Sequence, residues 1–220
     1  MAVITISREV GSLGTVIGNK AAELLGYRYV GKKTIEKVLQ QYGFVQFDEL
    51  YRSTPGFWAG LDDTNLLMIS MLNQCIQALA RHGDIVLVGR GGFTVLSDYA
   101  DVLNVRVQAP LAVRVQHVMA REGAVDRQAV EEQVKAIDRA RTAFLQTFYG
   151  LQPDAAGAFD LVVDTGAISA EMAASWVVAA TQALDQREGK AGSTTRQIEV
   201  DPILAKTVAD VLERLDHPDD

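Results

Sequence analysis

The sequence has few of the residues that mark several common protein classes. One cysteine, Cys75, is present among 220 residues, so no internal disulfide can form, and its apolar surroundings (LLMISMLNQCIQALA) indicate a small buried side chain. The three histidines, His82, His117 and His217, are not spaced as a metal-binding pair. No apolar run has the length of a membrane-spanning helix, and no leader-like segment opens the chain. We therefore expect a cytoplasmic protein without a membrane partner.

An excess of positive charge is also missing. The net charge is −7, from 21 basic and 28 acidic residues, and most of the acidic excess lies after residue 150. A protein without a basic stripe is a poor candidate for general nucleic-acid binding. The nearly neutral first part leaves room for a locally basic cleft, which would suit a small anionic ligand.

What the sequence does contain is an alternation of short β-branched runs and amphipathic segments. This alternation predicts an α/β fold with a parallel sheet and crossover helices. Strands are expected at 2–7, 27–30, 84–89, 102–107 and 159–165. Helices are expected at 14–26, 32–43, 61–83, 109–123 (with Pro110 in its first turn), 126–150 (bent or broken along its length) and 169–186. Residues 44–60 are expected to be irregular because Pro55 and Gly56 interrupt any period.

Composition also suggests how the chain is divided. Residues 1–186 form the body, and 187–200 (REGKAGSTTRQIEV) have the composition of a linker. Residues 201–220 contain a short amphipathic helix, 201–215, and an acidic end, DHPDD. That helix could dock on the body or on a partner.

The turn after the first strand, in ISREVGSLGTVIG, has features of a phosphate-binding loop. A strand–turn–helix unit points backbone N–H groups at an anion, and Gly11 and Gly14 permit a close approach. Ser12 and Thr15 offer hydroxyls to phosphate or Mg²⁺. The phosphate-loop pattern G-x-x-x-x-G-K-[ST] nevertheless fails at its first glycine and at its lysine, in whose place we find Leu13. Taken alone, a tight turn without a ligand is an equally good interpretation.

A buried strand ending in Gly-Arg-Gly-Gly brings Arg90 to the carboxyl edge of the sheet (VLVGRGGFTVL). Ligands of open α/β folds bind at that edge, and an arginine there can clamp a phosphate with two hydrogen bonds. The alternative is an arginine that pairs with a neighbouring acid such as Asp98.

A basic and aromatic segment, KAIDRARTAFLQTFYG, is the third candidate. Helical spacing brings Lys135, Arg139 and Arg141 close together, and Asp138 could orient one of them. The alternative is a solvated charged helix face without a ligand.

Taken in order, these segments resemble the cytidylate kinase-like family, a branch of the P-loop nucleoside monophosphate kinases. ITISREVGSLGT is similar to the family loop Ser-Arg-Glu-x-Gly-Ser-Gly-Gly, and VLVGRGGFTVLSDYADVLNVRVQAPLAVRVQHVMAREG to the stretch that contains its Gly-Arg motif. KAIDRARTAFLQTFYG resembles the lid, and FDLVVDTGAISAEMAASWV the last strand and helix. The resemblance covers roughly residues 2–180.

The resemblance implies a three-layer α/β/α P-loop kinase-like fold with a five-stranded parallel sheet and a helical lid at about 122–150, followed here by the C-terminal helical extension. It also implies a nucleotide as ligand, ATP with Mg²⁺ as donor, and CMP or another small phosphorylated molecule as acceptor. The implied phosphate-binding residues are Ser7, Arg8, Gly11, Ser12, Gly14 and Thr15. Arg90 would meet the acceptor phosphate, and the lid arginines Arg139 and Arg141 would neutralise charge.

Three departures from the related pattern keep a second hypothesis open. Leu13 stands where we place the lysine of cytidylate kinases, and their Arg-Asp becomes Arg90-Gly91. Gly31 replaces an aspartate that the family branch usually has. A catalytically inactive regulatory or protein-interaction module, acting as a homo-oligomer or through its C-terminal helix, fits these departures. The Arg8 side chain could restore the missing charge, depending on its direction.

Overall fold

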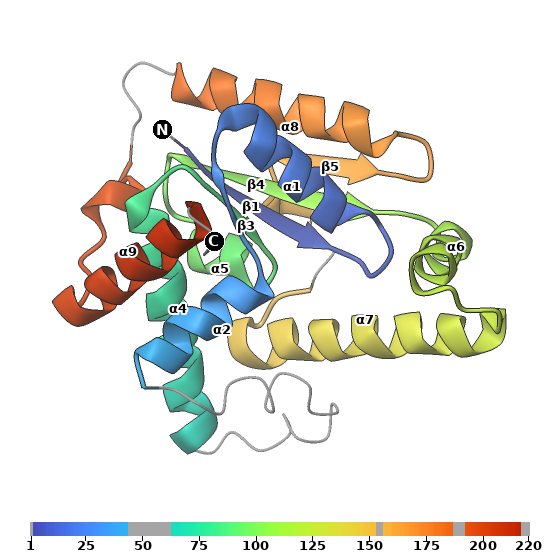
Figure 1. Ribbon diagram of the computed structural model, residues 1–220, viewed down its shortest axis with the longest axis horizontal. Coiled ribbons are helices and arrows are strands. Elements are labelled where there is room, and N and C mark those ends of the chain that lie inside the picture. Colours follow the sequence, from blue (N-terminus) through green and yellow to red (C-terminus); the bar gives the residue numbers. More distant parts are fainter. Residues whose placement is uncertain (1, 44–62, 153–155, 187–191, 217–220) are drawn as a thin grey trace.

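Five parallel strands form the centre of the computed structural model, which describes residues 2–43, 63–152, 156–186 and 192–216 (Figure 1). The sheet order is β2-β3-β1-β4-β5, and every neighbouring pair is parallel. The strands are β1 (Val3–Arg8), β2 (Arg28–Val30), β3 (Ile85–Val88), β4 (Val102–Gln108) and β5 (Leu161–Asp164). The predicted five-stranded parallel sheet is confirmed, and its carboxyl ends meet at one edge.

The central strands are apolar on both faces because helices cover both faces. Ile85 and Leu87 belong to one buried cluster, whereas Val86 and Val88, which alternate with them, belong to the other. The first face is covered by α2 (Lys32–Gln41), α4 (Asp63–His82), α5 (Gly92–Val95) and α9 (Pro202–Asp216). The second face is covered by α1 (Gly14–Leu25) and α8 (Ala170–Asp185), which pack side by side (Figure 1). The predicted three layers are confirmed.

Two further helices, α6 (Leu111–Glu122) and α7 (Arg127–Tyr149), pack together beside the carboxyl edge of the sheet (Figure 1). The expectation of a bent or broken helix at 126–150 is wrong, because α7 is continuous. Its interior holds no glycine or proline, the Asp126 carboxylate accepts a hydrogen bond from the Ala129 N–H at its start, and Gly150 ends it in a left-handed conformation. Pro110 precedes the first turn of α6 as its cap residue rather than lying within it.

The C-terminal helix docks on the body, which is one of the two positions that the sequence left open for it. Leu204, Val208 and Leu212 of α9 are buried in the cluster that α2 and α4 also line. The chain before it is attached as well, since the Asp101 carboxylate accepts hydrogen bonds of 2.8 Å from both the N–H and the hydroxyl of Thr195, in a short 3₁₀ helix (Thr195–Gln197). A further 3₁₀ helix among the described residues is Ala156–Ala158.

The segment 44–60, expected to be irregular, lies outside the described residues, as do 187–191 of the expected linker. Among the helices of the described residues, none combines the length and the apolar character needed to cross a bilayer.

The docking of α9 predicts a clear stability difference between two substitutions in this helix. Leu212→Ala should lower the free energy of unfolding by about 2–5 kcal/mol, because it leaves a cavity in a fully buried cluster. Ile203→Ala is the control: Ile203 is 70% exposed, and the loss should stay below about 0.5 kcal/mol. Urea unfolding of both variants measures the difference, and equal losses would contradict the docked position of α9.

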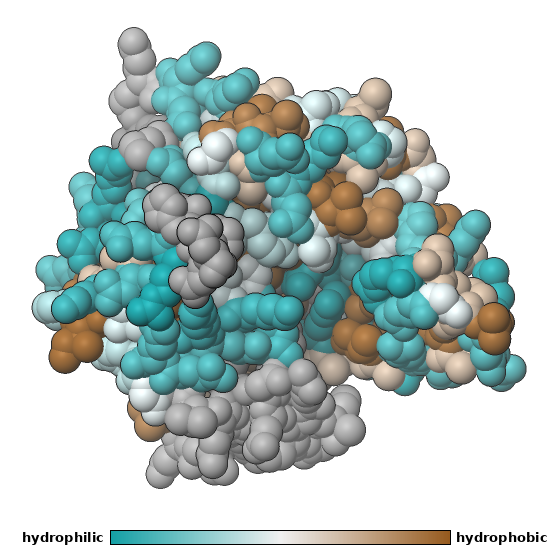
Figure 2. Space-filling model, viewed as in Figure 1, coloured by the Kyte–Doolittle hydropathy of each residue, from teal (hydrophilic) through white to brown (hydrophobic). Residues whose placement is uncertain are grey.

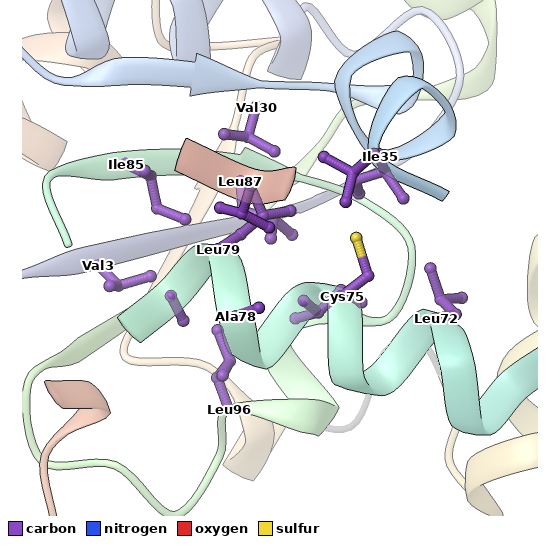
Figure 3. Close-up of a cluster of buried hydrophobic side chains, with 14 of the residues drawn as sticks. Val3, Val30, Ile35, Leu72, Cys75, Ala78, Leu79, Ile85, Leu87 and Leu96 are labelled. Atoms are coloured by element: carbon purple, nitrogen blue, oxygen red, sulfur yellow. The ribbon is translucent and has the colours of Figure 1, made fainter. Parts of the chain in front are cut away.

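Cys75 points from α4 toward Ile35 within the buried cluster, away from solvent (Figure 3). Burial raises the pKa of its thiol to about 12, so almost no thiolate is present near neutral pH. We expect the folded protein to resist a thiol reagent such as dithionitrobenzoate at about pH 8, and the denatured protein to react at once. Absorbance of the released thionitrobenzoate reports both rates. Rapid reaction in the folded state would show that Cys75 is accessible.

Candidate active site

The turn between β1 and α1 is held in shape by its own side chains and backbone. Ser12 is fully buried, and its single hydroxyl hydrogen is shared between the carbonyls of Glu9 (3.0 Å) and Val107 (3.1 Å). The Thr165 hydroxyl donates to the Ser12 carbonyl at 2.9 Å. Gly11 has φ +79° and packs directly against the backbone of Arg114, which leaves no room for a Cβ atom. The Ser12 hydroxyl therefore serves the architecture of the loop in this structure.

In the structure, the phosphate-loop pattern aligns with the sequence one residue further along than the sequence analysis placed it. Helix α1 begins at Gly14, and Leu13 before it has φ +63°, a left-handed conformation that glycine adopts readily and leucine does not. Aligning the hydroxyl of G-x-x-x-x-G-K-[ST] with Thr15 places the second glycine at Leu13 and the lysine at Gly14. The first glycine then corresponds to Arg8. The earlier placement of the lysine at Leu13 is thus wrong by one position.

Thr15 lies at the exposed start of α1 and lines a cavity together with the loop. It also contacts Tyr29, the middle residue of β2, the strand that follows α1 along the chain. Burial raises the pKa of the Tyr29 hydroxyl, while the nearby charge of Arg8 and a hydrogen bond with Thr15 act in the opposite direction. Tyr29 is therefore close to both the start of α1 and the charge of Arg8.

Arg90 follows β3 and sits at the carboxyl edge, as predicted. Its side chain is buried, with 4% of the residue exposed, and its φ of +59° is unusual for a residue with a side chain. An acid does pair with it, but the partner is Glu36 of α2, at 2.9 Å, and not Asp98, which accepts a hydrogen bond from Ser97. Strained backbone at a buried arginine is typical of a functional site.

Arg106 is a functional candidate that the sequence analysis missed. It lies on β4, is 7% exposed, and donates a hydrogen bond of 3.1 Å to the hydroxyl of Ser7. A second nitrogen of its guanidinium lies 3.6 Å from the Glu9 carboxylate. The signal was present in the sequence: an arginine inside the apolar strand VLNVRVQ must be buried with a partner or face a site.

Helices α6 and α7 are tied to the loop by polar contacts. The Asp138 carboxylate accepts a hydrogen bond from the Val10 N–H (3.1 Å) and pairs with Arg114 of α6 (2.5 Å). Arg141 donates to the Arg8 carbonyl at 3.0 Å. His117 of α6 lies with Nδ1 2.8 Å from the Gly11 carbonyl, which can only accept, so this nitrogen carries the proton. Asp138 therefore connects α7 to the loop and to α6. The ion pairs of the described residues do not show it orienting an arginine of its own helix, as the sequence had suggested.

The three basic residues grouped on α7 by sequence spacing separate in space. Arg141 faces the loop, whereas Lys135 pairs with Glu131 (2.8 Å) and Glu132 (3.3 Å) on the outer side of the helix. Arg139 is exposed and lines a shallow depression with Lys135, away from Arg90. The structure brings Arg141, but not Arg139, next to Arg8 and Arg90.

Four arginines at the carboxyl edge of the sheet line three adjoining cavities. The innermost, of about 40 Å³, is lined by Arg8, Arg90, Arg106 and Arg141, beside Ser7. Two larger ones, of about 250 and 350 Å³, share Arg8 and Arg141 in their walls, and the last also borders the loop and α6. The molecular surface is hollowed on this side and lined there by hydrophilic residues (Figure 2).

Such a cluster of guanidinium groups beside a helix start can hold several phosphate oxygens. Among the described residues, no group of three or more His, Cys, Asp or Glu side chains could by itself hold a metal ion. The Thr15 hydroxyl, exposed at the start of α1 where the phosphate-loop pattern has its Ser or Thr, is a side-chain oxygen that could contact Mg²⁺.

Comparisons with known proteins point to one family. The family model described as the cytidylate kinase-like family matches residues 3–167. The chain belongs to the cytidylate kinase-like family. It is a P-loop kinase-like protein by fold, and helix α9 lies beyond the matched range.

Its similarity to two cytidylate kinases is distant but extends over most of the chain. A cytidylate kinase of Ignicoccus hospitalis is 27% identical over 174 residues, which cover 78% of this chain and 94% of that protein. A cytidylate kinase of Methanopyrus kandleri is 25% identical over 197 residues, 84% and 96% of the two chains. The crystal structure of an uncharacterised protein from Eubacterium ventriosum has a TM-score of 0.66 at 19% identity, covering 85% of this chain and all of that one, and shares the fold.

The link through Asp138 can be tested by an isosteric pair of substitutions on α7. Asp138→Asn should lower the free energy of unfolding by about 1–3 kcal/mol, because it removes one of the two carboxylates that pair with the buried Arg114 guanidinium. Glu131→Gln removes the same charge from the exposed pair with Lys135, and stability should barely change. Chemical denaturation of both variants provides the comparison, and similar midpoints would contradict a structural role for Asp138.

Proposed function

We propose that this protein binds a nucleotide and transfers the γ-phosphate of ATP, with Mg²⁺, to CMP or another small phosphorylated acceptor. The observation that carries the proposal is the convergence of Arg8, Arg90, Arg106 and Arg141 on one small cavity at the carboxyl edge of the sheet. Open α/β folds bind their ligands at this edge, and four arginines suit a ligand with several negative charges.

The two substrates would occupy different sides of this cleft. The loop backbone, Thr15 and Arg141 border the larger cavity near α6 and would hold the donor phosphates. Arg90, on the other side, is held by Glu36 and would meet the acceptor phosphate. Phosphoryl transfer requires mainly in-line positioning and positive charge around the transferred group, and backbone amides, arginines and Mg²⁺ provide both without a side-chain base.

A catalytically inactive, regulatory member of the family is the second candidate. The observation in its favour is the absent lysine of the phosphate-loop pattern. Loss of one transition-state contact of this type lowers the rate by about 10²–10³, which would leave a very slow enzyme unless another group supplies the charge.

One pair of measurements separates the candidates. Calorimetric titration with ATP, GTP and CMP in the presence of Mg²⁺ detects binding, and a coupled assay of ADP release detects transfer. Binding of ATP and CMP together with ADP release that depends on CMP supports the proposed enzyme. Binding without turnover for any acceptor supports the regulatory alternative, and failure to bind any nucleotide would contradict both.

Arg90 provides a specific test of the acceptor site. Arg90→Ala should weaken CMP binding about tenfold to hundredfold, because a charged hydrogen bond to phosphate contributes about 1.5–3 kcal/mol. Arg90→Lys keeps the charge next to Glu36 and should lose less, which separates phosphate binding from misfolding. The control is Arg127→Ala, an exposed residue at the start of α7 that lines none of these cavities. Unchanged CMP affinity in Arg90→Ala would remove Arg90 from the acceptor site.

The lid arginines can be ranked in the same assay. The family resemblance gives a role to both Arg139 and Arg141, whereas the geometry favours Arg141, which borders the cleft. ADP release should therefore fall much further in Arg141→Ala than in Arg139→Ala. Equal losses would mean that α7 changes its position during turnover.

A further inference from the structure

The loop differs from the phosphate-loop pattern at two positions that lie next to each other in space. The pattern G-x-x-x-x-G-K-[ST], aligned on Thr15, has glycine at position 8 and lysine at position 14. This chain has the reverse, with a cationic residue, Arg8, at the first position and Gly14 at the second. The two departures are therefore a single exchange rather than two independent losses.

Steric contact explains why the exchange is reciprocal. A Cβ atom built on Gly14 would lie 2.6 Å from Cβ and 3.0 Å from Cγ of Arg8, closer than real Cβ contacts. Because the first of these neighbours is fixed to the backbone, it cannot swing aside. Only one of the two positions can carry a side chain in this loop geometry, whichever one it is.

The Arg8 side chain extends into the site. Its guanidinium lies directly over the α-carbon of Gly89, where no Cβ could be accommodated and where φ is +86°. It borders all three cavities of the cleft, including the one that the loop and α6 enclose. A side chain at residue 89 would therefore displace the guanidinium of Arg8, which can move, whereas the Cβ of Arg8 beside Gly14 cannot.

We infer that Arg8 replaces the phosphate-loop lysine, supplying its positive charge to the donor β- and γ-phosphates from the end of β1 instead of from the start of α1. This inference rests on the proposed nucleotide binding and names the residue that makes such binding work without a lysine. An arginine delivers a planar pair of N–H groups where a lysine delivers a point charge, so the phosphate would be held with defined orientation.

Nucleotide affinity tests the charge. Arg8→Gln keeps a long polar side chain without the charge, and should weaken binding of MgATP about tenfold to hundredfold in calorimetry. AMP lacks the β- and γ-phosphates, and its affinity should barely change. If wild-type protein binds MgATP and Arg8→Gln binds it equally well, or loses AMP to the same extent, the role of Arg8 is wrong while the proposed function stands. If wild-type protein binds no nucleotide, the proposed function fails and this inference fails with it.

A double-mutant cycle tests the exchange itself. Gly14→Lys alone should lower the urea midpoint, because the new Cβ collides with Arg8, whereas Gly14→Lys in an Arg8→Gly background should restore it toward that of Arg8→Gly alone. The double variant has the lysine in its usual place and should recover most of the MgATP affinity that Arg8→Gly loses. Additive effects on stability, or a folded double variant that binds MgATP no better than Arg8→Gly, would overturn the exchange.

Discussion

Several arginines buried close together at the carboxyl edge of one sheet impose the constraint on which the rest of this structure depends. Two like charges about 4 Å apart repel by about 4 kcal/mol at an effective dielectric constant of about 20, and burial adds a desolvation cost for each. Within the part of the chain that the structure describes, three carboxylates pair with these arginines. The pairs that result are Glu36–Arg90, Glu9–Arg106, Glu9–Arg114 and Asp138–Arg114.

These pairs also determine where the surrounding helices lie, because each carboxylate comes from a different element. Glu36 joins α2 to the end of β3, Glu9 joins the loop to β4 and α6, and Asp138 joins α7 to both α6 and the loop. The same carboxylates therefore balance the buried charges and fix the positions of the helices. Removing a carboxylate would leave a buried cation and detach an element at the same time, which is why the site cannot be separated from the architecture around it.

Local sequence signals were sufficient for the fold and for part of the site. The alternation of β-branched runs with amphipathic segments predicted the sheet, and the buried strand that ends in Gly-Arg-Gly-Gly placed Arg90 at its edge. The partners were not predictable, because Glu36 is 54 residues from Arg90, and Asp138 is 128 residues from Val10. Helical spacing describes only neighbours three or four residues apart. It therefore placed Lys135, Arg139 and Arg141 in one group, although their tertiary contacts lie on different sides of α7. The direction of a side chain at a strand end has no local signature at all.

The loop shows why a failed motif is weak evidence against phosphate binding. An anion at such a place would be held first by backbone N–H groups and the start of a helix, and these depend on backbone conformation rather than on residue type. Leu13 adopts the left-handed conformation of the glycine it replaces, at a cost of roughly 1–2 kcal/mol, and α1 still begins directly after it. The residues packed around the loop thus hold its backbone in a conformation that the loop sequence itself does not favour. With the backbone conserved in this way, what remains to be supplied is a positive charge at the right point in space, and residue 14 need not be its source.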